Sequence, residues 1–308
     1  MRYARPVNYA QLLFPDFSLI LGGYLICRFT ALNRAVWQPV EGLVYYLLFP
    51  VLLFQSIVRN PINVHEASGL MAAGLLLCLG GIALAYALPH LPGIGQHMPA
   101  RTHAGAAQVA FRFNSFMGLA LAERVAGSQG LQMIAVLIGV CVPLLNVAAV
   151  WPMARQGEHH FLRELLRNPL IIATVSGLAA NLAGLHIPGW MAPTVSRIGN
   201  AALVLGLMAA GAGLKLSALA SNKLLASELL LIRHAIQPLI AFAMVQLFHL
   251  NQPQAIALMA FSSLPTASSC YVLAVRMGYE GSFVASLVSL STMLGVLSLP
   301  FGLWLIGI

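Results

Sequence analysis

Ten long apolar stretches, separated by short polar breaks, constrain the fold of this chain more than any other feature of its sequence. They cover roughly residues 11–30, 36–58, 68–88, 105–122, 130–154, 169–185, 198–214, 227–249, 254–275 and 282–306. Most approach the ~20 apolar residues that a helix needs to cross the hydrocarbon core of a bilayer. Because backbone polar groups in lipid must be satisfied internally, such stretches indicate helices. The sequence therefore predicts an all-α integral membrane protein with ten transmembrane helices.

The composition excludes a water-soluble protein. Hydrophobic residues make up 59% of the chain and charged residues 8%, against the usual ~45–50% and ~25%. Ten helices of ~20 residues would leave roughly 100 residues for all loops, too few for a soluble catalytic domain. No two carboxylates stand at helical spacing inside an apolar stretch, and the HExxH, GxSxG and P-loop motifs are absent. We therefore expect no enzyme, no cofactor and no metal site.

The charges are scattered, and they indicate an orientation. The net charge of +8 comes from single residues between apolar stretches, whereas nucleic-acid binding needs basic residues clustered on one face. With the N-terminus outside, nine basic residues of the short loops lie inside and five outside, as the positive-inside rule favours. Pro15 and Asp16 before the first stretch, and Arg28 near its end, do not suit a cleaved signal peptide. We therefore expect the first stretch to remain as a helix, both termini to lie outside and the central loop to be cytoplasmic.

The longest polar segment, residues 155–168, divides the stretches into five and five. It predicts a first five-helix repeat over residues 1–154, a central cytoplasmic loop over 155–168 and a second repeat over 169–308. Because five is odd, duplicated halves would cross the membrane in opposite senses, as in the inverted repeats of many secondary transporters. At an offset of 152 positions, residues 121–124 (LAER) align with residues 273–276 (LAVR), which gives modest support.

Polar residues interrupt the fourth stretch at membrane depth. Arg112, Asn114 and Ser115 lie about eight residues past its inner end, and a broken helix survives there only where protein or a water-filled cavity covers it. Arg112 has two interpretations: it snorkels or pairs with a helix C-terminus, or it coordinates an anion. Asn114 can donate to a carboxylate without a charge of its own. Gly118 would allow a helix or ligand to approach closely.

The ninth stretch carries a similar polar interruption. Pro265 removes a backbone donor and clashes with the preceding turn, so the helix must open there. The freed carbonyls, with the hydroxyls of Thr266, Ser268 and Ser269, predict a polar site at mid-depth. The alternative for any one hydroxyl is a bond to the carbonyl one turn back.

Other residues inside apolar stretches are expected to shape helices. Pro50, Pro143 and Pro238 lie within apolar runs, where prolines commonly make kinks. Asn146, four residues after Pro143, would cap that break or line the pathway.

Charged groups elsewhere have simpler explanations. We interpret Arg233 as snorkelled or locally paired, with Glu228 nearby, and a proton relay through His234 stays open. The segment Glu158-His159-His160 suits a solvated loop better than a metal site. The four cysteines, Cys27, Cys78, Cys141 and Cys270, are expected to be small buried hydrophobes.

Several motifs, in order along almost the whole chain, resemble those of a known family. They are residues 43–54 (LVYYLLFPVLLF), Arg112-Phe113-Asn114 with Gly118, residues 142–147 (VPLLNV), Asn168-Pro169, Ile198-Gly199 with Gly211 and Gly213, residues 265–269 (PTASS) with Leu273-Ala274, and Thr292 with Leu299-Pro300. Together they are similar to the auxin efflux carrier family, which includes bacterial malonate and malate permeases. One departure is Ala120, where many relatives have a proline.

The resemblance implies two inverted five-helix repeats in which broken helices four and nine cross at mid-membrane. It implies a multi-pass protein of the cell inner membrane, a secondary transporter that binds an anion between a scaffold and a transport bundle. On this basis we expect Asn114, Thr266, Ser268 and Ser269 to hold a carboxylate of a small organic anion.

Several alternatives stay open. The first is a sodium-coupled carrier of the bile-acid type, which would use unwound carbonyls as sodium ligands. Proton coupling and a homodimer are also compatible with the sequence. A membrane enzyme or a sensor has less support, because catalytic pairs and an output domain are missing.

Overall fold

Helices form the regular structure of the protein. The computed structural model describes residues 9–59, 64–93, 95–156, 167, 169–213 and 222–308, and these residues contain no β-strand. Described helices lie in all ten windows that the apolar stretches predicted. The prediction of an all-α fold is therefore confirmed for the described residues.

The first half of the chain ends in a sharply kinked helix. Its elements are α1 (Tyr9–Phe29), α2 (Arg34–Leu43), the π turn η1 (Val44–Leu48), α3 (Phe49–Val58), α4 (Val64–Ala87), the 3₁₀ turns η2 (Leu88–His90) and η3 (Gly95–His97), α5 (Ala100–Ala106), the 3₁₀ turn η4 (Ala107–Ala110) and α6 (Ser115–Gln156). The kink in α6 lies at Gly127, whose φ of 62° and ψ of −150° are open to glycine and strained for other residues. Gly127 thus separates the fourth predicted window from the fifth.

The second half has a similar succession of elements. They are α8 (Pro169–Leu182), α9 (Ala192–Ala212), α11 (Lys223–Leu231), the π turn η5 (Ile232–Ile236), α12 (Gln237–Leu247), α13 (Gln252–Ser263), α14 (Ser269–Arg276) and α15 (Gly281–Trp304). The sequence Glu158-His159-His160 and most of the expected central loop lie outside the described residues.

Five helical segments among the described residues are long and apolar enough to cross a membrane. They are Arg34–Gln55, Ser68–His90, Val136–Arg155, Lys223–Leu247 and Gly281–Trp304. Large apolar side chains such as Phe29, Leu297 and Trp304 are more than two-thirds exposed, a pattern that suits lipid rather than water. The protein therefore spans a membrane several times, whereas the prediction that all ten windows cross it in two inverted repeats stays a prediction.

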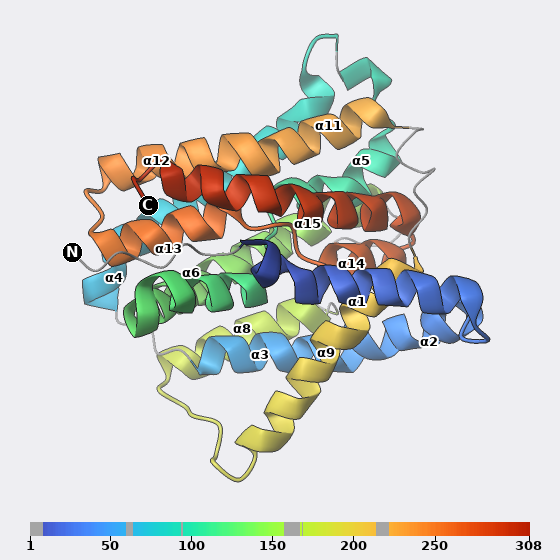
Figure 1. The fold of residues 1–308 in the computed structure, drawn as a ribbon, viewed down its shortest axis with the longest axis horizontal. Coiled ribbons are helices and arrows are strands. Elements are labelled where there is room, and N and C mark those ends of the chain that lie inside the picture. The colour runs from blue at the N-terminus through green and yellow to red at the C-terminus, as the bar shows by residue number, and fades with distance from the viewer. Residues whose placement is uncertain (1–8, 60–63, 94, 157–166, 168, 214–221) are drawn as a thin grey trace.

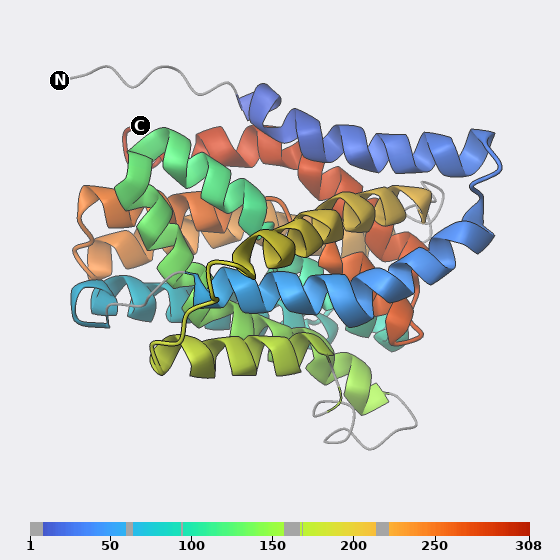
Figure 2. The ribbon, with the colours of Figure 1, turned by 90° about the horizontal axis from the view of Figure 1, so that it is seen from below.

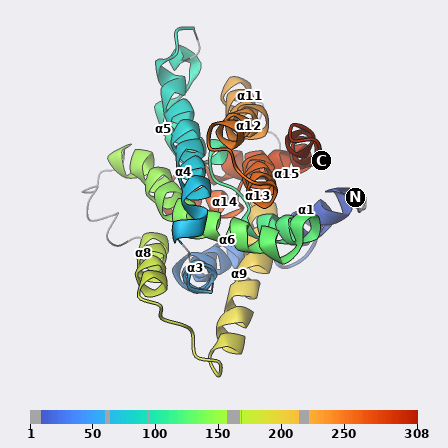
Figure 3. The same ribbon diagram turned by 90° about the vertical axis from the view of Figure 1, so that its left-hand side faces the viewer.

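The helices form two groups. In the first group, α1 packs against α9, and α3 packs against both α8 and α9. In the second group, α6 packs against α4 and α13, while α15 packs against α13 and α14. Figure 3 shows α3, α8 and α9 on one side of α6, with α11, α12 and α13 on the other. Most helices of both groups run nearly parallel to the long axis of the molecule (Figure 1).

Glycines allow the helices of the first group to approach closely. An added Cβ at Gly23 of α1 would lie 2.0 Å from the carbonyl oxygen of Met208 in α9, and one at Gly211 would lie 1.8 Å from the carbonyl oxygen of Ile20. Small residues commonly bring membrane helices into backbone contact in this way. Figure 2 shows α1 along one edge of the molecule, beside α15, which it also contacts.

The cysteines are free thiols. Cys78, Cys141 and Cys270 are buried, and Cys27 is half-buried. The expectation that they act as small buried hydrophobes is confirmed for the first three.

Candidate functional site

Two helices are interrupted, and the interruptions touch each other. The backbone is not helical at Phe111–Asn114, between η4 and α6, and at residues 264–268, between α13 and α14. Residues 111 and 264 are 153 positions apart, within one residue of the register predicted for the repeat. The backbone N–H of Asn114 donates a hydrogen bond to the carbonyl oxygen of Pro265, with an N–O distance of 2.9 Å. The two predicted polar interruptions are therefore in direct contact.

Local chemistry explains where each interruption begins and ends. Pro265 has no backbone N–H, so α13 cannot continue through it. Asn114 caps α6, since its side-chain oxygen accepts a hydrogen bond from the backbone N–H of Met117 at 3.3 Å. An added Cβ at Gly118 would lie 2.9 Å from the Leu264 side chain. The close approach predicted at Gly118 is confirmed, and its neighbour is the ninth-window interruption.

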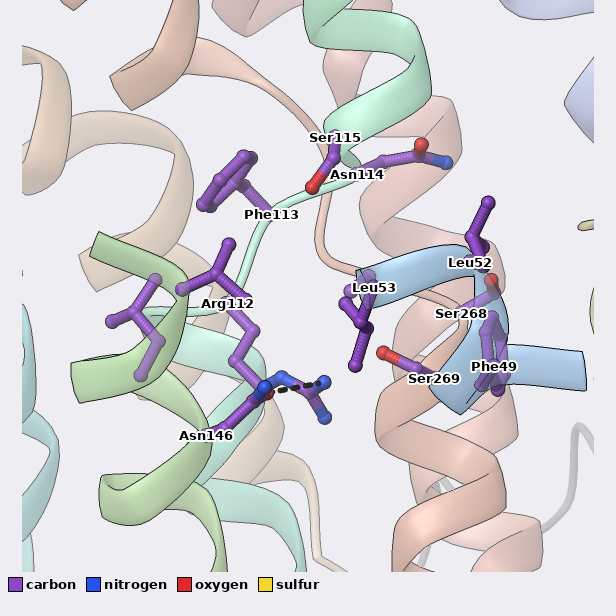
Figure 4. A pocket seen from close by; sticks show the side chains of 13 residues that line it. Phe49, Leu52, Leu53, Arg112, Phe113, Asn114, Ser115, Asn146, Ser268 and Ser269 are labelled. Atoms are coloured by element: carbon purple, nitrogen blue, oxygen red, sulfur yellow. Dashed lines mark hydrogen bonds between the residues drawn. The ribbon is translucent and has the colours of Figure 1, made fainter. Parts of the chain in front are cut away.

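A small cavity of about 60 Å³ lies beside this contact. Its polar lining combines both interruptions and α6: Arg112, Asn114, Ser115, Asn146, Ser268 and Ser269. Its apolar lining includes Phe49, Leu52 and Leu53 of α3, which belongs to the first helix group. Figure 4 shows the residues of α3 beside Ser268 and Ser269, opposite Arg112 and Asn146. The cavity thus lies between the two groups.

The electrostatics of the cavity favour an anion. The N-terminus of α6 begins at Ser115, and that of α14 begins at Ser269, so two helix N-termini meet at its wall. Each N-terminus is equivalent to about +0.5 charge. Arg112 adds a full positive charge to the lining. The positive charge of Arg112 thus adds to that of the two helix ends.

Arg112 is fixed by neighbouring amides. It is 5% exposed, and its guanidinium donates to the side-chain oxygens of Gln108 at 2.9 Å and Asn146 at 3.1 Å. Figure 4 shows this side chain turned toward Asn146, in a different direction from that of Asn114. The snorkelling interpretation of Arg112 is wrong, because the side chain is buried against α6. Asn146 lines the cavity, and its predicted role in lining a transport pathway stays a prediction.

Thr266 and Pro265 do not line this cavity. The backbone N–H of Thr266 donates to the hydroxyl of Ser291 in α15 at 2.9 Å. The Thr266 hydroxyl lies 3.5 Å from the thiol of Cys270. Of the residues predicted to hold a carboxylate, the structure thus gathers Asn114, Ser268 and Ser269, and places Thr266 behind them.

The other predicted helix breaks have different forms. Pro50 and Pro238 each lie two residues after a π turn, η1 and η5 respectively. In a π turn, backbone hydrogen bonds span five residues instead of four. This change in the hydrogen-bond pattern accommodates a proline, which has no backbone N–H to donate. Pro143 lies inside α6. Their role as hinges stays a prediction.

Gln108 was missed by the sequence analysis. It is fully buried, and its side-chain nitrogen donates to the carbonyl oxygens of Gly105 at 3.0 Å and Cys270 at 3.1 Å. It thereby links the end of α5 to α14 and also orients Arg112. Its spacing of four residues before Arg112, inside an apolar stretch, was the available signal.

Glu41 and Arg233 are buried charged residues that the sequence did not mark as buried. Glu41 is 1% exposed and forms an ion pair with Arg34 at 2.5 Å. Arg233 is neither snorkelled nor paired with a carboxylate in the described structure: it is 1% exposed and donates to three backbone carbonyls. The interpretation of Arg233 is therefore wrong.

Comparison with known proteins gives one family. Residues 151–303 match the model of a family described as membrane transport protein, and no curated protein matches the chain. The matched residues run from the end of α6 nearly to the end of α15 and include the second interruption. Over residues 151–303, this multi-pass membrane protein is therefore similar to the membrane transport proteins of the auxin efflux carrier family.

Proposed function

We propose that this protein is a secondary active transporter that moves small organic anions across the membrane by alternating access. The observation that carries the proposal is the small polar cavity beside the two touching interruptions, between the two helix groups. Interrupted membrane helices whose N-termini point at a shared site are a common way to bind anionic substrates in secondary transporters.

The proposed substrate site uses residues of both interruptions. The amide of Asn114 and the hydroxyls of Ser115, Ser268 and Ser269 donate hydrogen bonds to a carboxylate, and Arg112 supplies a balancing charge. Pro265 and Thr266 hold the second interruption in place from behind. A cavity of about 60 Å³ suits a small carboxylate, and malonate and malate are the substrates that we propose to test first.

The position of the cavity between the groups supports the proposal of alternating access. Movement of the second group relative to α3 would open the cavity first to one side and then to the other. We propose that the chain consists of two inverted five-helix repeats in the cell inner membrane and that each helix group contains helices of both repeats. The interrupted helices would cross at mid-depth. The central loop would lie in the cytoplasm, and a homodimer is compatible with this arrangement.

The test is counterflow in proteoliposomes. Vesicles loaded with unlabelled malonate, malate or a monocarboxylate are placed in medium with the labelled acid, in the absence of ion gradients. We expect saturable uptake of at least one dicarboxylate above that of protein-free vesicles. If the folded protein exchanges none of these acids, the proposal of an organic-anion carrier is wrong.

A polar cluster joins α2, which packs against α9 of the first group, to α14 of the second group, and it leads to a further prediction. Arg34 of α2 pairs with Glu41 and donates to the hydroxyl of Tyr271 in α14 at 2.7 Å, and this hydroxyl donates to the Glu41 carboxylate. If α14 moves relative to α2 during transport, these bonds to Tyr271 must break. Tyr271→Phe removes them, which shifts the balance of states by up to about tenfold for a loss near 1.4 kcal/mol.

Labelling of the cavity can measure this shift. We expect a water-soluble maleimide to label a Ser269→Cys variant several-fold faster when Tyr271→Phe is also present. Tyr86→Phe is the matched control, because its hydroxyl bonds to the Ala148 carbonyl within the second group. Equal labelling of both double variants would contradict a gating role for the cluster.

A further inference from the structure

A buried arginine lies at the end of α13. Arg233 belongs to η5, between α11 and α12, and is 1% exposed. Its Nε donates to the carbonyl oxygen of Leu264 at 2.8 Å. Its Nη2 donates to the carbonyl oxygens of Phe261 at 3.0 Å and Ser262 at 2.8 Å. One guanidinium therefore binds three carbonyl oxygens within a span of four residues at the C-terminal end of α13.

These bonds supply what an interrupted membrane helix lacks. The last four carbonyls of a helix have no partner within it, and an unsatisfied carbonyl inside a membrane protein is costly. At the end of α13, the Ser263 carbonyl accepts from the Ser298 hydroxyl at 2.8 Å. The Pro265 carbonyl accepts from Asn114. Arg233 satisfies the remaining carbonyls of this turn, those of Phe261, Ser262 and Leu264.

The neighbouring histidine holds the same segment through two serines. His234 lies 2.8 Å from the hydroxyls of both Ser298 and Ser291 in α15. Ser298 binds the Ser263 carbonyl, and Ser291 accepts from the N–H of Thr266. His234 of η5 therefore binds two serines of α15 that hold the end of α13 and the middle of the interruption.

Such a cluster of carbonyls is a place where a cation is expected. Hard cations bind oxygen ligands, and unwound carbonyls at half-helix C-termini coordinate sodium in many secondary transporters. Here the guanidinium of Arg233 occupies the carbonyls. The ion pair found in the described part of the chain joins Arg34 to Glu41, so helix-end carbonyls rather than a carboxylate balance the charge of Arg233.

We propose that Arg233 acts as a fixed cation at the second interruption, in place of a mobile coupling ion, so that transport by this chain does not require sodium. This inference rests on the proposed function and specifies its ion coupling. It argues against the sodium-coupled alternative, because a fixed guanidinium charge already lies among the carbonyls that would ligate sodium and would repel a second cation. Arg233 is thus a positioning residue, which acts on the cavity through the segment that carries Ser268 and Ser269.

A test without substrate uses chemical rescue. Arg233→Ala leaves the three carbonyls without their hydrogen-bond donor. We therefore expect the detergent-solubilised variant to melt at a lower temperature than the parent protein. Millimolar methylguanidinium should recover part of that loss, and Arg233→Lys should melt between the parent and the alanine variant. Arg101→Ala is the matched control, because exposed Arg101 donates to a single carbonyl, that of Gly278, at 2.8 Å.

Two results of this test would overturn the role of Arg233. One is an Arg233→Ala protein that melts like the parent. The other is equal stabilisation of the Arg233→Ala and Arg101→Ala proteins by methylguanidinium, since that would show a nonspecific effect.

The second test compares cations during malonate counterflow. With sodium, potassium or choline at equal concentration on both sides, the parent should exchange malonate at the same rate. Arg233→Ala should lose about tenfold or more of this rate, as expected for lost hydrogen bonds to a charged group, and Arg233→Lys or added methylguanidinium should restore part of it. Stimulation of the parent by sodium would overturn the inference. If the parent exchanges none of the tested acids, the proposed function fails, whereas the melting experiment still decides the role of Arg233.

Discussion

Asn114→Ala is expected to abolish anion counterflow while the protein remains folded. The substitution removes an amide donor from the cavity wall, at the point where the two interruptions meet. The backbone bond from Asn114 to Pro265 survives, because alanine keeps its N–H. The variant also loses a helix cap at α6, which costs about 1 kcal/mol of stability. We would measure labelled malonate counterflow together with the melting temperature in detergent.

The control must reproduce the loss of the cap without touching the cavity. Asn251 is suitable, because its side chain caps α13 by accepting from the backbone N–H of Gln254 at 3.1 Å, and it does not line the cavity. Asn251→Ala should cost similar stability and leave counterflow nearly intact. Asn114→Ser keeps a capping oxygen but loses the amide, so we expect it to transport poorly. Normal counterflow by Asn114→Ala would remove this residue from the substrate site.

Gly23→Val is expected to disrupt the packing of α1 against α9. A Cβ at Gly23 would lie 2.0 Å from the backbone oxygen and 2.6 Å from the backbone carbon of Met208. Because the obstacle is backbone, no side chain can rotate away, and the two helices must separate. Overpacking of this kind costs roughly 1–3 kcal/mol or more. We expect a clearly lower melting temperature and less monodisperse protein after purification in detergent.

The adjacent glycine provides a matched control. Nothing lies within 4 Å of an added Cβ at Gly22, which is half-buried on the same helix. Gly22→Val changes the composition and the helix propensity of α1 in the same way as Gly23→Val. Equal melting temperatures for the two variants would show that the backbone contact between α1 and α9 does not contribute to stability.

The sequence located the helices because the membrane imposes a local rule. Each helix that crosses lipid needs a continuous apolar stretch and forms its backbone hydrogen bonds within itself. Its position can therefore be predicted from consecutive residues of the sequence. The same rule exposed the interruptions. Pro265, and the polar run that contains Arg112 and Asn114, conflict with a continuous apolar helix, and the backbone is indeed not helical there.

The sequence could not show which partners these polar residues have. Arg233, six residues into an apolar stretch, suggested a side chain that reaches for the membrane surface or for Glu228. Its partners are instead the carbonyls of residues 261, 262 and 264, about thirty positions away. Backbone carbonyls are present in every residue, so no residue type marks them in a sequence as the ligands of a cation.

The sequence by itself determined that this chain is an all-α membrane protein and where its helices are interrupted, because hydropathy and proline act over one or two helical turns. Only the tertiary structure decided that the interruptions touch, that Thr266 lies behind the cavity and Ser268 and Ser269 line it, and that Glu41 is buried beside Tyr271. These outcomes depend on the direction of each side chain and on contacts between residues as much as 230 positions apart. Local sequence patterns do not specify such contacts, since the packing of whole helices fixes them.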